Sequence, residues 1–283
     1  AFPDFCKYIE DIADEFRDLQ GYHADGKPYS LPVKISVLTH WGKLRSWTCG
    51  GHFHEHPDLD LINLLESLSG LPVEVEFVNF EELKEGRFSG NVLLNAGLAA
   101  SAWSGGDEWK DSRVVEQITR FVEEGGTLLG VNESSEVHGF DTNLRLAHLF
   151  GVDLDRGEFN CHGKYPIAEE ASAQKIGNIE GKGEAFVFAD DVRILRADGG
   201  KLALSQRSFG KGRCIYMASY RHNGENARML LHLLYGEDAL YVPDRTEAEC
   251  AYFPASKKLV IINNSDQAFT TCIRTQEGEI TVR

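Results

Sequence analysis

The sequence has no apolar run near the roughly 20 residues that a membrane-spanning helix needs, and it has no cluster of Lys and Arg. Its 29 basic residues are outnumbered by 44 acidic ones, which gives a formal charge of −15. A surface that follows the phosphates of a nucleic acid or of an anionic membrane is therefore not expected. The first residues also lack the charged-then-apolar order of a signal peptide. We expect a cytoplasmic protein with neither nucleic acid nor membrane as a partner.

Cysteine is scarce and scattered, and no two cysteines form a CxxC pair. A chain of 283 residues does not need disulfides to hold its fold, so we expect reduced thiols at all six positions. Methionine is absent from position 1, and on this ground we expect the chain to be part of a longer protein. Apolar residues make up 42%, enough for a core, and the length suits one large domain with a smaller appendage.

The N-terminal segment predicts an amphipathic helix over residues 5–19. Its apolar positions recur at helical spacing, and Asp4, after Pro3, is a candidate N-cap. The following residues, 20–32, are polar and contain two Gly and two Pro, so they are predicted to form a linker. We expect the helix to belong to a preceding domain.

Strands and helices alternate from residue 33 onward, which predicts parallel pairing with right-handed crossovers. The expected strands span 34–38, 73–80, 92–95 and 127–131, and the expected helices span 58–68, 114–122 and 142–150. Residues 153–183 are predicted to be loops or short edge strands. Closely spaced strands follow at 185–188, 193–196, 202–204 and 213–218, before a closing helix at 226–234. Beyond residue 243, strands at 249–253, 258–262, 270–274 and 279–282 predict a small antiparallel β module.

Several motifs occur in an order that resembles one known family. They are WGKLRSW at 41–47, LSGLP at 68–72, NAG at 95–97, AWSGG at 102–106, GGTLLGVN at 125–132, FGKGR at 209–213 and NNS at 263–265. Together they resemble the central and C-terminal domains of the 1,3-β-galactosyl-N-acetylhexosamine (lacto-N-biose) phosphorylases. A single motif such as GKGR is weak, whereas WGKLRSW combined with AWSGG is specific. The resemblance covers nearly the whole chain.

This resemblance implies an α/β fold with a doubly wound, mostly parallel sheet of the class I glutamine amidotransferase-like (flavodoxin-like) type, followed by the small antiparallel module. The implied domains are 1–32, a remnant helix of a missing catalytic barrel plus linker; 33–242, the amidotransferase-like domain; and 243–283, the start of a C-terminal β domain. The (β/α)8 barrel of the family performs the catalysis, so this chain alone is expected to be inactive and to carry no catalytic residue, metal or cofactor.

For the parent protein, the resemblance implies a glycosyltransferase of galactose metabolism. The reaction splits a β-galactosyl-N-acetylhexosamine with inorganic phosphate into α-galactose 1-phosphate and a free sugar, with inversion. Sugar and phosphate would reach the parent through the barrel, and a homodimer is left open. Galactosyl-rhamnose specificity also stays open, because the two activities would share these domains.

Two other classes of function are weighed beside this accessory role: a stand-alone sugar-binding module on the same fold, and an independent amidohydrolase. An amidohydrolase needs a nucleophile on a tight elbow after a strand. Residues 96–98, which follow the third strand, contain no Cys, Ser or Thr. The only adjacent Cys–His pair, Cys161–His162, lies in the irregular region, so hydrolysis is not expected.

The best metal candidate is the segment with Cys49, His52, His54 and His56, since alternate residues of an extended loop can face one way. The alternative is a solvated loop at a helix start, followed by Pro57 and Asp58. Without a second cluster at the usual spacing, we expect no stable metal site.

Polar and aromatic residues follow three of the predicted strands, and the carboxyl ends of parallel strands share one edge of a sheet, where ligands collect in such folds. Either a substrate-adjacent site or interdomain packing would use these residues. We expect Arg45 to hold a carboxylate or phosphate oxygen, with Glu133 as its nearest acidic partner. The Gly105–Gly106 pair is a weak phosphate signal. The candidate residues are Trp41, Arg45, Trp47, Trp103, Ser104, Gly105, Gly106, Asn132 and Glu133.

Overall fold

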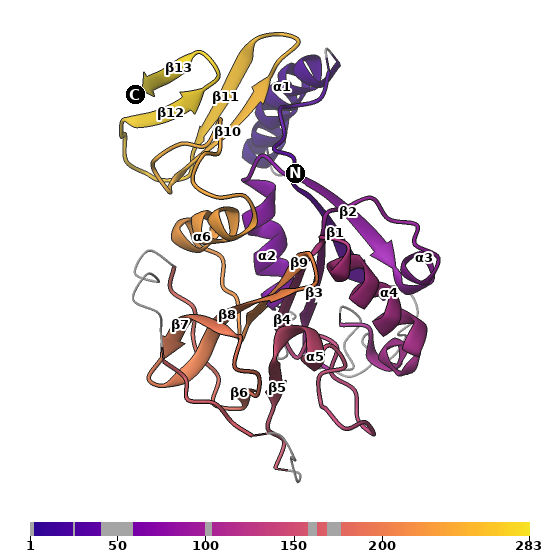
Figure 1. Ribbon diagram of the computed structural model, residues 1–283. Helices are drawn as coiled ribbons and strands as arrows, with labels where there is room; N and C mark the ends of the chain where they lie inside the picture. Colours follow the sequence, from indigo (N-terminus) through magenta and orange to yellow (C-terminus); the bar gives the residue numbers. More distant parts are fainter. Residues whose placement is uncertain (1–2, 25, 41–58, 100–103, 158–162, 169–176) are drawn as a thin grey trace. The chain divides into compact units, whose positions relative to one another are not determined.

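The computed structural model describes residues 3–24, 26–40, 59–99, 104–157, 163–168 and 177–283 (Figure 1). The chain divides into two compact units. The larger unit contains residues 32–69 and 73–234, and the smaller one contains 1–31, 70–72 and 235–283.

A seven-stranded sheet in the order β2-β1-β3-β4-β9-β8-β7 forms the centre of the larger unit. Its strands are β1 (Lys34–Thr39), β2 (Glu74–Asn79), β3 (Val92–Gly97), β4 (Thr127–Asn132), β7 (Arg193–Asp198), β8 (Lys201–Phe209) and β9 (Gly212–Met217). The first five strands in this order, β2 to β9, run parallel, and β8 and β7 add antiparallel pairs at one edge. A short antiparallel pair, β5 (Val152–Leu154) with β6 (Ala185–Val187), forms a separate ladder.

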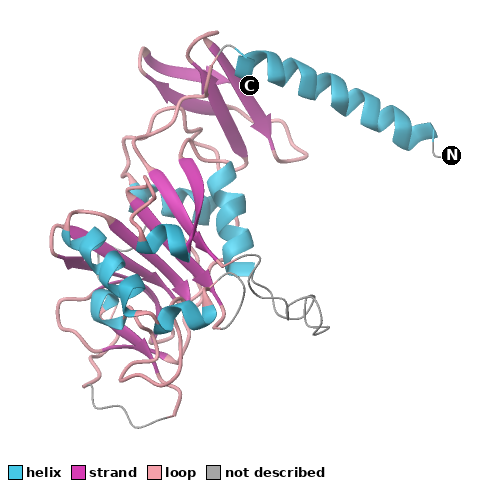
Figure 2. Ribbon diagram, turned by 90° about the vertical axis from the view of Figure 1, so that its right-hand side faces the viewer, coloured by secondary structure: helices cyan, strands magenta, loops and turns pink. Residues whose placement is uncertain are grey.

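Helices lie on both faces of this sheet (Figure 2). They are α2 (Leu59–Ser69), α3 (Phe80–Lys84), the 3-10 helix η3 (Gly106–Lys110), α4 (Ser112–Glu123), α5 (Ala147–Phe150) and α6 (Gly224–Leu234). Helix α2 packs with α6, and α3 packs with α4. The inner face of α4 carries Val114, Ile118 and Val122, all fully buried at a spacing of four residues, which is the pattern of a helix with one face on a core.

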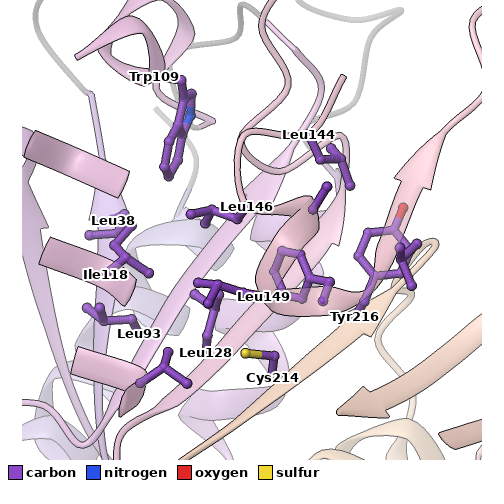
Figure 3. Close-up of a cluster of buried hydrophobic side chains, with 14 of the residues drawn as sticks. Leu38, Leu93, Trp109, Ile118, Leu128, Leu144, Leu146, Leu149, Cys214 and Tyr216 are labelled. Carbon is purple, nitrogen blue, oxygen red and sulfur yellow. The ribbon is translucent and has the colours of Figure 1, made fainter. Parts of the chain in front are cut away.

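The core beneath α4 and α5 joins side chains from elements far apart in sequence (Figure 3). Trp109, Ile118, Leu128, Leu149 and Tyr216 meet there, all almost completely shielded from solvent. Cys214 lies in the same cluster, and burial raises the pKa of its thiol to about 12. A thiol with so high a pKa stays protonated at neutral pH and is a poor nucleophile.

The smaller unit contains α1 (Pro3–Ala24) and two hairpins. Strand β10 (Ala248–Phe253) pairs with β11 (Lys258–Asn263), and β12 (Thr271–Thr275) pairs with β13 (Gly278–Val282). The rings of Tyr241 and Tyr252 stack with their centroids 4.2 Å apart, and Tyr29 meets Tyr241 edge-on at 4.8 Å. This aromatic cluster, together with the bond from the Tyr29 amide to the Tyr252 carbonyl, ties residues before and after the larger unit to each other.

Three local expectations from the sequence are wrong. The predicted linker 20–32 begins later, because α1 continues to Ala24. The predicted helix 142–150 is reduced to α5, because the Asp153 carboxylate accepts the backbone N–H groups of Asn143 and Leu144 and holds this segment outside a helix. Asp4 is not an N-cap, because the helix already includes Pro3 and Asp4 lies in its first turn.

Candidate functional site

The carboxyl end of β4 carries Asn132 in the left-handed region of backbone conformation, with φ of 64°. Its side-chain amide donates to Asp60 Oδ2 at 2.6 Å, and its amide oxygen accepts from Lys182 Nζ at 2.5 Å. The Tyr216 hydroxyl donates to the Asn132 carbonyl at 3.0 Å. Asparagine tolerates this backbone region better than most residues, and it also bridges a carboxylate and an ammonium group. Asn132 is therefore fixed from three sides.

Asp60, in the first turn of α2, connects three elements through its buried carboxylate. One oxygen accepts from Asn132, and the other accepts from the Tyr220 amide at 2.7 Å. Tyr220 follows β9, so the start of α2 is joined to the carboxyl ends of both β4 and β9. A buried carboxylate needs such partners, because its desolvation is costly otherwise.

Glu133 is the next residue after β4, and it belongs to an ion-pair cluster centred on Arg156. Its Oε1 lies 2.5 Å from Arg156 Nη2, and its Oε2 accepts the Ala99 amide at 2.7 Å. Arg156 also binds Glu136 through two bonds of 2.9 and 2.6 Å and Glu184 at 2.9 Å. The hydrogen bonds that Arg156 donates to Glu136 and Glu133 raise the pKa of its guanidinium, although burial acts to lower it. One cation thus serves three carboxylates, and Glu133 also holds the segment that follows β3.

The turn after β3 is held by Ser104, whose backbone carbonyl accepts from the Asn95 side chain at 3.2 Å and from the Trp109 indole N–H. Gly105 has φ of 103°, and a Cβ there would lie 2.3 Å from the Phe80 ring. Only glycine fits both the conformation and the space. Gly106 is buried and opens η3, whose first turn carries Asp107 and Glu108. Packing and backbone conformation account for Gly105, and Gly106 also has a positive φ, of 53°.

The remaining sequence-predicted residues, Trp41, Arg45, Trp47 and Trp103, lie outside the described residues. The same holds for Cys49, His52, His54, His56 and the Cys161–His162 pair. The described candidates do come together: Glu133 reaches the end of β3 through Ala99, and Asn95 Oδ1 accepts the Ser135 amide at 3.1 Å. The partners that complete the site were not predicted. They are Asp60, Glu136, Arg156, Lys182 and Tyr216, and no sequence motif marks any of them.

Among the described residues of the larger unit, Ser67 Oγ lies 2.8 Å from His222 Nδ1. A nucleophile and its base would have this distance. Ser67, however, lies in the interior of α2 at 1% exposure and accepts a hydrogen bond from the Tyr220 hydroxyl at 2.7 Å. Burial raises the pKa of that hydroxyl to about 12, although the bond to Ser67 lowers it. A substrate cannot reach Ser67, so the pair serves as a tie between α2 and the segment after β9.

Within the residues that the structure describes, no group of three or more His, Cys, Asp or Glu side chains is arranged to hold a metal ion. In the same part of the chain, no helix combines the length and the apolar character needed to cross a membrane.

Two family models match the chain consecutively. Residues 34–238 match the central domain of lacto-N-biose phosphorylase, and residues 241–283 match the C-terminal domain. The chain belongs to the lacto-N-biose phosphorylase family. Residues 34–238 alone make up more than half of the chain, and they contain every described candidate residue of the strand-end site.

Curated relatives of this lacto-N-biose phosphorylase family member agree with that assignment. The chain is 42% identical over 291 residues to a D-galactosyl-β-1→4-L-rhamnose phosphorylase from Lachnoclostridium phytofermentans, covering 100% of this chain and 39% of the relative. It is 31% identical over 332 residues to a 1,3-β-galactosyl-N-acetylhexosamine phosphorylase from Bifidobacterium longum subsp. longum, covering 98% and 43%. The chain thus spans about two fifths of the length of these relatives.

Among solved structures, a β-galactosidase from Rahnella sp. R3 matches with a TM-score of 0.50 and 15% sequence identity. The match covers 90% of this chain and 40% of that one. At this identity the likeness is one of fold.

Proposed function

We propose that this chain is the non-catalytic part of a β-galactoside phosphorylase. The parent enzyme would split a β-galactosyl-N-acetylhexosamine with inorganic phosphate into α-galactose 1-phosphate and a free sugar. Inversion follows when phosphate attacks the anomeric carbon while a carboxylic acid protonates the departing oxygen. The observation that carries the proposal is the consecutive match of two domain models of this family, over 34–238 and 241–283.

The strand-end carboxylates support a scaffold role for this chain. A general acid must hold a proton within reach of the substrate oxygen. Glu133 and Glu136 instead accept hydrogen bonds from the guanidinium of Arg156, and Asp60 accepts from an amide and a side-chain N–H. None of the three is arranged to deliver a proton, so the proton donor would belong to another part of the parent.

The proposal extends to fold type and domains. We assign the sheet to the class I glutamine amidotransferase-like type, and the strand order supports this. Numbered along the chain, the five parallel strands lie in the order 2-1-3-4-5, which is that of doubly wound flavodoxin-like sheets. The proposed domains are residues 33–242 and 243–283, preceded by a helix and linker at 1–32. A cytoplasmic location stays a prediction from the sequence.

A second acceptor deserves equal testing. The chain is 42% identical to the galactosyl-rhamnose phosphorylase and 31% identical to the B. longum enzyme, so rhamnose is tested as the alternative acceptor. The acceptor pocket would lie in the part of the parent that this chain does not span, so both acceptors enter the assay.

The experiment measures galactose 1-phosphate released from galactosyl-β-1,3-N-acetylglucosamine and from galactosyl-β-1,4-rhamnose. We expect no release by the chain alone. We expect release when the chain replaces the matching region of the full-length L. phytofermentans rhamnose phosphorylase. Phosphorolysis by the chain alone would contradict its non-catalytic role. A replacement enzyme that folds but releases no galactose 1-phosphate would contradict the proposal that this chain is part of a working phosphorylase.

The two rival functions have direct assays. Ammonia release from glutamine would support an amidohydrolase, and calorimetric binding of galactose by the isolated chain without turnover would support a stand-alone sugar-binding module. We expect neither.

A further inference from the structure

The segment between β9 and α6 contains the one Asn–Gly pair of the sequence, Asn223–Gly224. Asparagine is a chemically labile residue, because the backbone nitrogen of the next residue can attack its side-chain amide carbon. Glycine in that next position leaves the approach open, since it has no Cβ and its backbone turns freely. Of all asparagines in the sequence, Asn223 therefore meets the least local hindrance to this attack.

In the folded chain, Asn223 is exposed and lies directly before the first residue of α6. Its carbonyl accepts the Ala227 amide at 2.9 Å, and its side-chain oxygen accepts the Asn226 amide at 2.8 Å. These are the two bonds of an N-cap residue, and we call them the α6 cap. They restrain the backbone and the side chain of Asn223, and so oppose the rotations that the attack requires.

The attacking nitrogen belongs to Gly224, the first residue of α6. An α-helix supplies no acceptor for the N–H groups of its first residues, so the bonds of the helix itself do not hold this nitrogen. The α6 cap is therefore the restraint that has to open before the nitrogen reaches the side chain of Asn223.

Residues on both sides of the pair are anchored. The His222 amide donates to Asn63 Oδ1, on α2, at 2.7 Å. Asn226 is fully buried and donates through its side chain to the carbonyls of Asn178 and Arg221 at 3.0 and 2.8 Å. These bonds confine local opening to the α6 cap, and the ends of helices are the parts that open most readily.

We propose that Asn223 is a deamidation site whose rate is set by opening of the α6 cap. Gly224 N loses its proton and bonds to Asn223 Cγ, the Cγ–Nδ2 bond breaks, and the side-chain nitrogen takes up a proton and leaves as ammonia. Water then opens the resulting cyclic imide at either of its carbonyl carbons. One opening gives aspartate, and the other gives isoaspartate, in which the backbone runs through the former side chain.

The two products differ in their effect on α6. Aspartate caps a helix as well as asparagine does, and its charge suits the positive end of the helix dipole. Isoaspartate adds a carbon atom to the backbone before Gly224 and removes the capping side chain. We expect Asn223→Asp to keep the thermal midpoint of the unsubstituted chain, and the isoaspartyl form to unfold about 2–4 °C lower.

The test follows deamidation of the whole chain at mildly alkaline pH by peptide mass spectrometry. The tryptic peptide 222–228 reports on Asn223, and fragmentation separates this residue from Asn226. The reference is Asn264, an exposed asparagine that precedes Ser265. We expect Asn223 to react about tenfold faster than Asn264, because serine has the Cβ that glycine lacks. In urea, where the α6 cap is lost, we expect Asn223 to react about tenfold faster again.

Two glycine substitutions complete the experiment. Gly224→Ala adds a Cβ beside the attacked carbon and leaves Asn223 as the cap, so we expect the reaction at Asn223 to slow about tenfold. Gly21→Ala adds a Cβ that would meet nothing within 4 Å, and it should leave the rate unchanged. Equal rates at Asn223 and Asn264, or a rate that Gly224→Ala does not change, overturn the site. Equal rates at Asn223 in the folded and the urea-unfolded chain overturn its control by the α6 cap.

Discussion

At the scale of single residues, the polar side chains at the carboxyl ends of β4 and β9 are bonded to one another. Asn132 connects Asp60 with Lys182, and Glu133 connects Arg156 with the Ala99 amide. Each of these bonds crosses between elements that are far apart in sequence. The cluster therefore fixes the relative positions of strand ends and of the segments that follow them.

Asn132 combines a strained backbone with two side-chain bonds, and the two contributions can be measured apart. We expect Asn132→Gly to lower the free energy of unfolding by about 1–2 kcal/mol, because Asp60 and Lys182 lose a buried partner. Asn132→Ala should cost about 1 kcal/mol more, since alanine is unfavourable at a φ of 64°. Urea unfolding of both variants checks this. Equal stability of the two variants would show that the backbone relaxes at this position.

At the scale of elements, the amino ends of β1 and β2 are joined to the turn before β3 through Glu76. Its carboxylate accepts from Ser36 Oγ at 2.6 Å and from the amides of Ser89 and Gly90, and it pairs with Lys34 at 2.9 Å. Burial acts to raise the pKa of Glu76, but these hydrogen bonds outweigh it and lower the pKa to about 2.

This shift predicts a pH dependence. Because the folded-state pKa lies below the ordinary value of 4.5, ionised Glu76 stabilises the fold above pH 4.5, and this stabilisation is lost as the pH falls from 4.5 to about 2. We expect Glu76→Gln to lower the free energy of unfolding by about 1–2 kcal/mol at pH 7. The difference in this free energy between the variant and the unsubstituted chain should narrow as the pH falls from 4.5 to about 2. Glu116→Gln, at an exposed position of α4, is the control. If the difference in the free energy of unfolding were constant between pH 7 and 3, ionised Glu76 would not be the stabilising form.

The turn between β3 and η3 offers a matched pair of glycine substitutions. Gly105 and Gly139 both have left-handed backbones, with φ of 103° and 96°. A Cβ at Gly105 would overlap the Phe80 ring at 2.3 Å, whereas a Cβ at Gly139 would meet nothing within 4 Å. Gly139→Ala should therefore cost about 1 kcal/mol for the backbone alone, and Gly105→Ala about 1–3 kcal/mol more. Thermal unfolding of the two variants would contradict this if their midpoints agreed.

At the scale of the whole molecule, we expect no structural metal. Dialysis against a chelator should leave the thermal midpoint and the far-ultraviolet circular dichroism unchanged, and elemental analysis should find no stoichiometric zinc. Structural zinc contributes directly to folding, so its removal would lower the midpoint by many degrees. A midpoint that falls after dialysis, together with zinc that is lost in His54→Ala, would instead assign a metal to the segment with His52, His54 and His56.

The sequence by itself indicated the strands, most of the helices and the family of this protein. Strands and most helices were predictable because burial periodicity is local: residues 34–38 predict β1 (Lys34–Thr39), and residues 127–131 predict β4 (Thr127–Asn132). The motifs at 41–47 and 102–106 indicated the family that the domain models then showed.

Tertiary structure alone decided how the polar residues pair. Glu133 was expected beside Arg45, which lies outside the described residues; within them, Glu133 pairs with Arg156, from a segment with weak periodicity. Asp60 reaches Asn132 across 72 positions and the Tyr220 amide across 160. The first part of the predicted helix 142–150 does not form, because the Asp153 carboxylate, which follows in sequence, accepts the N–H groups of Asn143 and Leu144. Periodicity in the sequence shows which side of an element is buried. Side-chain hydrogen bonds depend on which elements lie next to each other, and only the folded chain brings these elements together.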